Sequence, residues 1–450
     1  MKKILPILLL AIFFSACRKD NYADYDSSSG AAYTYSGKYT RNYFNLLCTI
    51  SKSTPGFFPP EVARAYGYVG IANYEAVVPG IPGAQSLGGQ LNGLAAGDIP
   101  SLPQNLLCNW GIASNAAIAD MIRKMFEKKI SSVNAAKIDS TEQANLKEMA
   151  VASTPDMVNR SIQFGKQVAA AIYKFSLTDG GHEAYLDPFQ LPYSMPPDPS
   201  CWVPTSATLH PVSPYWGSNR AFIQANVTTT QHFTPTKFST SPASDFYKNA
   251  LEVYNQVKNN TPEQVTITKY WSDDPFNTCT PTGHTFNTMT QLLEETNATL
   301  EKSAVAYAKL CVAENDAFIA CWKSKYTSIL IRPVSYIKQN IDPSFSTVIG
   351  TPAFPAFTSG HSVEIGAGSK IFIDMFTNGS GQYSFTDFSQ LQYGFAARHY
   401  NNFNDMAEEC ANSRFYGGIH YKEDNTIGLA QGRAVGDIVL KTIKWPTNVR

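Results

Sequence analysis

Helical periodicity is the feature that most constrains the fold of this chain. Apolar residues recur at intervals of three and four over long segments, and loops rich in Pro and Gly separate these segments. No series of strand-like alternation stands out. The pattern predicts helices over 61–76, 106–128, 141–149, 158–175 and 286–330, and others that start near 245, 361 and 425. We therefore expect an all-α helical bundle with long irregular loops.

Length and composition divide the chain and limit its partners. The 450 residues, 44% of them hydrophobic, are enough for a large core. We expect an N-terminal helical region over 38–244, whose Pro-rich loop spans 179–244, and a C-terminal helical bundle over 245–450 that carries the functional site. Lys plus Arg equals Asp plus Glu at 36 each, so no global charge attracts nucleic acid or an anionic membrane. Any affinity for anions must be local.

The N-terminus has the pattern of a lipoprotein signal peptide over 1–17. Lys2 and Lys3 precede a short apolar run that ends at Phe14, and two small residues then precede Cys17. We expect Cys17 to be lipidated and 18–37 to form a flexible tether; an ordinary secretory signal is the alternative. These features predict a cell-envelope, outer-membrane lipoprotein that faces the periplasm or the exterior and meets the membrane only through its anchor.

The remaining cysteines and histidines give no metal signature. The eight cysteines include no CxxC pair and no zinc spacing, so we interpret those after Cys17 as small apolar residues, with their pairing open. Five histidines fall into no metal-ligand spacing and are assigned structural roles: His182, His210, His232, His284 and His399.

Two basic residues stand seven apart near the end of the longest predicted helix. Lys325 and Arg332 are therefore expected on one face of the same helix, with Trp322 on that face too. Two basic groups with no acid between them indicate an anion between them. Taken alone, the pair is more typical of a solvated basic stripe.

Two further motifs follow. Ser359 and Gly360 precede a helical pattern, so a hydroxyl N-cap, free N–H groups and the helix dipole would face an anion there. Later, Arg414 is separated from His420 by two glycines, and Asp424 is one turn beyond His420, where it can orient the imidazole.

Together these motifs, Lys-x6-Arg-Pro, Ser-Gly-His and Ser-Arg-x5-His, resemble the signature of vanadium-dependent haloperoxidases and type 2 phosphatidic acid phosphatases. Thr358 stands where that signature usually has proline. The resemblance implies a helical bundle of this type that binds vanadate or phosphate. It assigns the oxyanion to a set of five residues: Lys325, Arg332, Ser359, Gly360 and Arg414. It makes His420 the vanadium ligand or the phosphorus nucleophile, His361 the acid–base, and Lys325 the group that polarises peroxide.

Residues outside this set favour the haloperoxidase. Trp322 and Phe354 resemble halide-side residues, and the segment around Asp274 resembles one whose acid pairs with a site arginine, here Arg332 or Arg414. The implied reaction uses vanadate, hydrogen peroxide and a halide, with iodide as the first expectation, and halogenates a small organic acceptor. The alternatives are a metal-independent acid phosphatase that acts through a phosphohistidine, without vanadate, and a non-catalytic surface-binding lipoprotein. The sequence does not indicate the oligomeric state.

Overall fold

The computed structural model describes residues 29–450 apart from 104–105, 192, 206, 448 and 450. The expected signal peptide with Cys17, and the tether up to residue 28, lie outside the described residues. Fourteen α-helices lie within the described part, together with one short antiparallel strand pair, β1 (Phe385–Asp387) and β2 (Arg398–Tyr400). The prediction of an all-α fold is confirmed.

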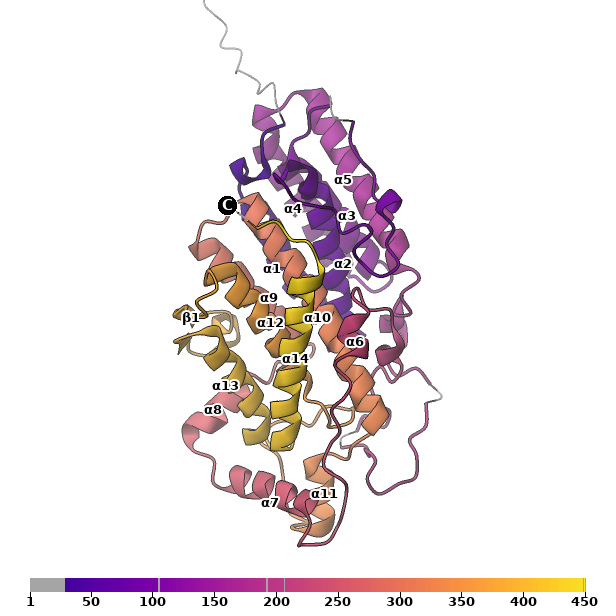
Figure 1. The fold of residues 1–450 in the computed structure, drawn as a ribbon, viewed down its shortest axis with the longest axis vertical. Coiled ribbons are helices and arrows are strands. Elements are labelled where there is room, and N and C mark those ends of the chain that lie inside the picture. The colour runs from indigo at the N-terminus through magenta and orange to yellow at the C-terminus, as the bar shows by residue number, and fades with distance from the viewer. Residues whose placement is uncertain (1–28, 104–105, 192, 206, 448, 450) are drawn as a thin grey trace, which may run out of the picture.

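Five helices form the N-terminal region (Figure 1). They are α1 (Lys38–Ser53), α2 (Pro59–Val77), α3 (Trp110–Phe126), α4 (Ser132–Met149) and α5 (Pro155–Ser176). The periodic segments predicted here overlap α2 to α5, although α4 begins at Ser132 rather than near 141, and α1 has no counterpart among them. The end of the expected tether is packed on the body: the N–H of Gly37 donates to the carbonyl of Ala298 at 3.2 Å, and that of Leu300 to Tyr35 at 2.8 Å.

The middle of the chain contains the Pro-rich loop and the longest helix. The loop includes the short α6 (Ala225–Thr228), and the helices after it are α7 (Asp245–Lys258), α8 (Pro262–Tyr270), α9 (Thr280–Glu295), α10 (Leu300–Ser328) and α11 (Pro333–Asn340). The single helix predicted over 286–330 is wrong, because α9 ends before Asn297, which has a φ of 45°. The hydroxyl of Thr299 then accepts from the N–H of Lys302 and caps a new helix.

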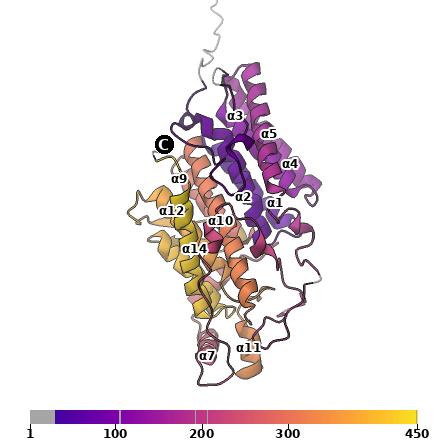
Figure 2. The same cartoon turned by 45° about the vertical axis from the view of Figure 1, so that its right-hand side comes forward.

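The helix α10 is the centre of the molecule. Figures 1 and 2 show it between the N-terminal helices and the C-terminal group α12 (Gly360–Phe376), α13 (Phe403–Tyr416) and α14 (Lys422–Thr442). Most of α10 is buried around its whole circumference, as expected for a helix enclosed by others. One hydrophobic core therefore includes residues from both halves of the chain.

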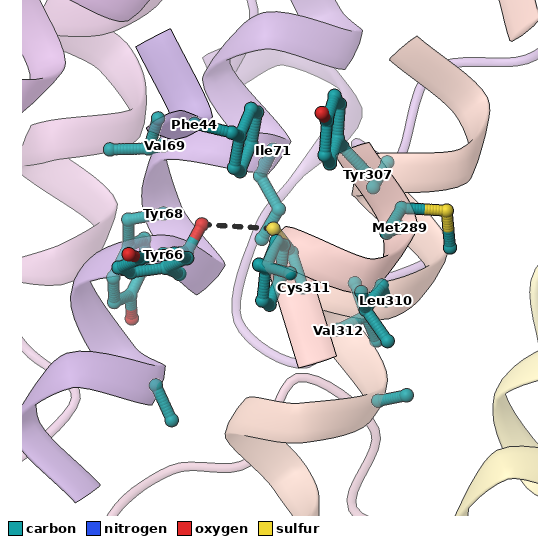
Figure 3. Close-up of a cluster of buried hydrophobic side chains, with 14 of the residues drawn as sticks. Phe44, Tyr66, Tyr68, Val69, Ile71, Met289, Tyr307, Leu310, Cys311 and Val312 are labelled. Carbon is teal, nitrogen blue, oxygen red and sulfur yellow. Dashed lines mark hydrogen bonds between the residues drawn. The ribbon is translucent and has the colours of Figure 1, made fainter. Parts of the chain in front are cut away.

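Close contacts in this core fix α10 against α1 and α2 (Figure 3). The ring of Phe44 stacks on that of Tyr307, with centroids 3.6 Å apart. The thiol of Cys311 donates to the carbonyl of Tyr66 at 3.0 Å. A β-carbon at Gly70 would lie 2.2 Å from Sγ of Cys311, so only glycine allows the two helices to approach this closely.

A disulfide joins α1 to the residue that precedes α9. Cys48 and Cys279 are bonded across a sequence separation of 231 residues. The other described cysteines are free and buried: Cys108, Cys201, Cys311, Cys321 and Cys410. The interpretation of the cysteines as small apolar residues therefore holds for these five, whereas Cys48 and Cys279 form a disulfide.

The helix that begins at the Ser-Gly-His motif is held by a glycine-lined contact with α14. A β-carbon at Gly432 would lie 1.9 Å from the carbonyl oxygen of Val363, and one at Gly366 would lie 2.8 Å from the carbonyl oxygen of Leu429. These glycines let α12 and α14 pack backbone against backbone. The position of His361, near the start of α12, depends on this contact.

We predict that Gly432→Ala lowers the free energy of unfolding by about 1–3 kcal/mol, because α12 and α14 must separate to admit the methyl group. Urea unfolding of the purified protein measures this loss. Gly97→Ala is the matched control, since a β-carbon at Gly97 meets no atom within 4 Å. Equal free energies of unfolding for the two variants would contradict the prediction.

Candidate active site

Lys325 and Arg332 lie on two different helices, contrary to expectation. The helix α10 ends at Ser328 because Ile329 adopts a left-handed conformation with a φ of 49°. Arg332 is the N-cap residue of α11 and is held in the extended region by the proline that follows it. The two residues meet instead through the loop before α12.

Carbonyl oxygens of that loop bind both side chains. The buried ammonium group of Lys325 donates to the carbonyls of Pro355 at 2.9 Å, Ala356 at 3.1 Å and Thr358 at 2.5 Å. Nε of Arg332 donates to the carbonyl of Phe354 at 2.8 Å. One strip of backbone therefore orients both basic groups.

Arg332 also fixes the proton on His420. Nη1 of Arg332 lies 2.9 Å from Nε2 of His420, and Nδ1 of His420 lies 3.0 Å from Oδ2 of Asp424. A guanidinium group can only donate, so Nε2 is the acceptor and Nδ1 carries the proton toward Asp424. Burial, with Arg332, Lys325 and Arg414 nearby, holds the pKa of His420 well below its usual value. The imidazole is therefore neutral, with its Nε2 lone pair directed toward the basic groups.

Ser359 and Gly360 occupy the start of α12 as the motif predicts, but the hydroxyl does not cap the helix. Ser359 is the N-cap residue, and its N–H donates to the carbonyl of Asp424 at 3.1 Å. Its buried Oγ has no hydrogen-bond partner among the described residues. A β-carbon at Gly360 would meet only the ring of Trp322, at 3.8 Å. The hydroxyl is thus available to a guest.

Arg414 reaches the same place from α13. Its Nη1 donates to the carbonyl of Trp271 at 2.5 Å, and its buried Nε has no hydrogen-bond partner within the described part of the chain. Asp274 was expected to pair with Arg332 or Arg414, but no ion pair within 4.0 Å joins these residues where the structure describes them. Backbone carbonyls occupy the arginine donors instead. Burial raises the pKa of Asp274, and the positive charge of Arg414 opposes this rise.

A cavity of about 490 Å³ lies over these groups. Seven of the residues singled out from the sequence line it: Asp274, Trp322, Phe354, Gly360, His361, Arg414 and His420. Lys325, Arg332 and Ser359 are buried beside it. The rings of Trp322 and Phe354 lie 5.0 Å apart on one side, and the indole of Trp322 also lines a second cavity of about 740 Å³ together with Tyr326.

The electrostatics of the site favour a small anion. Lys325, Arg332 and Arg414 have no ion-pair partner among the residues that the structure describes, and burial lowers the pKa of each. A bound anion would reverse that penalty, and the arginines could bind it through forked hydrogen bonds. Ser359 Oγ and Arg414 Nε, both buried without partners in the described structure, are the donors such a guest would satisfy. The residues therefore fit a tetrahedral oxyanion such as vanadate.

Comparisons with known proteins agree with this site. Residues 306–448 match the family model described as the VCPO second helical-bundle domain. A crystal structure described as the first bacterial vanadium-dependent iodoperoxidase is 30% identical, with a TM-score of 0.83 over 92% of this chain and 99% of that chain. A bacterial vanadium-dependent chloroperoxidase, in holo form, is 14% identical, with a TM-score of 0.67 over 87% of this chain and 93% of that chain. No curated protein matches the chain.

The chain belongs to the vanadium haloperoxidase superfamily. This membership supports an enzyme with haloperoxidase activity, and the relatives imply vanadate, peroxide and halide.

Across the described residues, no helix is both long and apolar enough to cross a membrane. No group of three or more His, Cys, Asp or Glu side chains in that same part of the chain is arranged to hold a metal ion.

Sequence reasoning missed a buried polar cluster behind His361. His284 lies 3.1 Å from both carboxylate oxygens of Asp273 through Nδ1, and 3.1 Å from Oδ2 of Asp387 through Nε2. The adjacent acids Asp273 and Asp274 were a signal, but only Asp274 was singled out. Nothing local marks the partnership of His284 with Asp387, which is 103 residues away.

The stability of the protein should depend on the charge of His284. Interactions with Asp273 and Asp387 outweigh burial and raise the pKa of His284 from 6.5 to about 10. A group whose pKa is raised by folding stabilises the folded state fully below its unfolded pKa and loses that effect as the pH rises through the folded pKa. The contribution should therefore decline between pH 6.5 and about 10.

We predict that the wild type exceeds His284→Gln in free energy of unfolding, and that this difference shrinks steadily over that pH range. Urea unfolding at several pH values measures it. His232→Gln is the control, because His232 is exposed and lies outside this buried cluster. A difference between wild type and His284→Gln that stays constant with pH would contradict the prediction.

Proposed function

We propose that the protein is a vanadate-dependent iodoperoxidase that oxidises iodide with hydrogen peroxide to hypoiodous acid. The observation that carries the proposal is the set of three buried basic side chains around the Nε2 lone pair of His420, with no carboxylate paired to them in the described structure. Bound vanadate supplies a Lewis-acidic centre that activates peroxide for two-electron oxidation of a halide while vanadium keeps its oxidation state.

The residues divide the work of binding that group. His420 would offer Nε2 as the ligand in exchange for the hydrogen bond that this nitrogen accepts from Arg332, and Asp424 holds the proton on the opposite nitrogen. Lys325, Arg332 and Arg414 offset the negative charge. Ser359 Oγ and the N–H of Gly360, at the positive end of α12, add neutral donors.

His361 and Lys325 serve the reaction itself. Burial, with Arg414, His284 and Lys325 nearby, holds the pKa of His361 well below its usual value, so its neutral imidazole can accept a proton from hydrogen peroxide and return it to a leaving oxygen. The ammonium group of Lys325, whose N–H groups are donated to loop carbonyls, would polarise peroxide through its positive charge.

Two observations support iodide as the halide. Phe354 packs against Trp322 in the cavity wall, so this side of the cavity presents aromatic rings and position 354 carries no histidine. A large, polarisable halide such as iodide is the easiest to oxidise and needs the least help from the protein. The relative that is 30% identical is described as an iodoperoxidase. The hypoiodous acid then iodinates a small organic acceptor.

The test is to remove bound oxyanions by dialysis with chelator, add orthovanadate, and measure halide oxidation with peroxide. We predict activation by vanadate, with iodide turned over faster than bromide and chloride inert. His420→Ala should abolish vanadate binding in equilibrium dialysis, and His361→Ala should lower turnover by roughly 100-fold or more while vanadate still binds. His232→Ala, at an exposed histidine, is the control.

A phosphatase would give the opposite response. Hydrolysis of a chromogenic phosphomonoester that vanadate inhibits, with no halide oxidation after vanadate loading, would overturn the proposal. Activity with chloride alone would overturn the iodide assignment and leave the haloperoxidase class intact.

We also propose that Cys17 carries a lipid anchor that holds the enzyme at the outer membrane, facing the periplasm or the exterior. The support is the basic, apolar and small-residue order that ends at Cys17. Metabolic labelling with a fatty acid in a bacterial host should label the full-length chain, and Cys17→Ser should abolish the label. Equal labelling of a Cys108→Ser control shows that the anchor depends on Cys17, whereas an unlabelled wild type would contradict the proposal.

A further inference from the structure

One face of α14 contacts the residues at the start of α12. Asp424 and Gln431 are seven residues apart, two helical turns, and so share a face of α14. The carbonyl of Asp424 accepts from the N–H of Ser359 at 3.1 Å. Oε1 of Gln431 accepts from the hydroxyl of Thr358 at 2.7 Å. Between the two on this face is Gly428, where a β-carbon would lie 3.1 Å from the carbonyl oxygen of Ser359.

The buried amide of Gln431 has a fixed orientation. Its Nε2 donates to the carbonyl of Thr230 at 3.1 Å and to the hydroxyl of Ser324 at 3.0 Å. Because a carbonyl can only accept, the nitrogen is the end that faces Thr230, and the oxygen is the end that faces Thr358. The hydroxyl of Thr358 is therefore the donor. Another acceptor for this hydroxyl, the sulfur of Cys321, lies 3.7 Å away and is weaker.

Thr358 connects this amide to the oxyanion site. Its carbonyl accepts from the ammonium group of Lys325 at 2.5 Å, the shortest of the three contacts that hold that group. The next residue is Ser359, whose buried Oγ has no hydrogen-bond partner in the described structure. Thr358 stands where the signature usually has proline, which has no side-chain donor, so this link to α14 is not part of the signature. A shift of Thr358 would move both the charge of Lys325 and the hydroxyl of Ser359.

We propose that Gln431 is a positioning residue of the oxyanion site: by accepting from Thr358, it keeps the loop before α12 in the place that an anion needs. Gln431 lies outside the cavity lining, so it acts on a guest only through this loop. The effect on peroxide chemistry rests on the proposed function. The effect on binding does not, because vanadate and phosphate present the same tetrahedral set of oxygens to Lys325 and Ser359.

Two structural alternatives compete with this proposal. Lys325 and Asp424 can hold the loop without help, in which case the bond to Gln431 contributes only to stability. Gln431 can also serve only to join α14 to Ser324 of α10. In the first case the affinity for an oxyanion does not depend on the hydroxyl of Thr358. In the second case the affinity responds to changes at Gln431 but not to loss of that hydroxyl.

The first experiment separates the hydroxyl of Thr358 from its shape in the full chain. Thr358→Ser keeps the donor and loses a methyl group, whereas Thr358→Val keeps the shape and loses the donor. We expect Thr358→Val to raise the Kd for orthovanadate in equilibrium dialysis by roughly 3–10-fold, the effect of about one buried hydrogen bond. Thr358→Ser should bind more tightly than Thr358→Val. The reverse order, which packing alone would give, overturns the proposal, and so does an unchanged Kd in Thr358→Val.

Gln431→Leu removes the same bond from the other side. It should raise the Kd at least as much as Thr358→Val, and the double variant should show little further loss. Thr290→Val is the matched control, because this buried hydroxyl also bonds a side chain at 2.7 Å, that of Tyr307, and does not line the cavity. The control should keep the wild-type Kd. An equal rise in Thr290→Val, or losses that add in the double variant, overturns the proposal.

Hydrogen exchange without added vanadate gives a readout that does not depend on the proposed function. The N–H groups of Ala356 and Ser359 donate to carbonyls at 3.0 and 3.1 Å, so they exchange slowly while the loop is in place. We expect Gln431→Leu to speed exchange in the peptide over 354–362, and Thr290→Val to leave it unchanged. Unchanged exchange in Gln431→Leu overturns the proposal. A wild type that binds no orthovanadate refutes the proposed function, while the exchange still decides whether Gln431 holds the loop.

Discussion

Burial of basic side chains without carboxylate partners is the constraint on which the rest of the site depends. Removing Lys325, Arg332 and Arg414 from water is costly, and like charges at close range add to that cost. Backbone carbonyls offset part of it, and they come from three separate segments: the loop before α12, the turn before His420, and Trp271. The irregular loops therefore direct carbonyl dipoles at the basic groups. Arg414 keeps an unpartnered Nε for an anion, whereas Lys325 donates all three N–H groups to carbonyls and acts on an anion through its charge.

Much of the fold and of the site was predictable because the signals are local. Apolar periodicity predicts helices α2 to α5, and the Ser-Gly-His motif predicts the start of α12 at Gly360. The prediction failed where the apolar pattern continues through a break. Asn297 and Ile329 both adopt a left-handed conformation, so one expected helix became two, and Arg332 moved to the start of α11. Asn297 is a residue type that tolerates this conformation, whereas a β-branched residue such as Ile329 adopts it only where tertiary contacts impose it.

The partnerships that escaped prediction all join distant segments. Cys48 and Cys279 are separated by 231 residues, and His284 meets Asp387 across 103 residues. Spacing carries no information about such pairs. The resemblance to a known family supplied the grouping of Lys325, Arg332, His361, Arg414 and His420, and the structure places these residues in and beside one cavity. In the structure, backbone carbonyls contact Arg332 and Arg414 in place of the expected ion pair with Asp274. No sequence motif indicates such contacts.

Trp322 lines two cavities, so its position affects the size of both. Its indole forms a common wall of two hollows, and the carbonyl of Val212 accepts both from its N–H, at 3.3 Å, and from the hydroxyl of Tyr326, at 2.6 Å. Because the same side chain lines both cavities, replacing Trp322 by a smaller residue would change the space beside Phe354 and the space beside Tyr326 together.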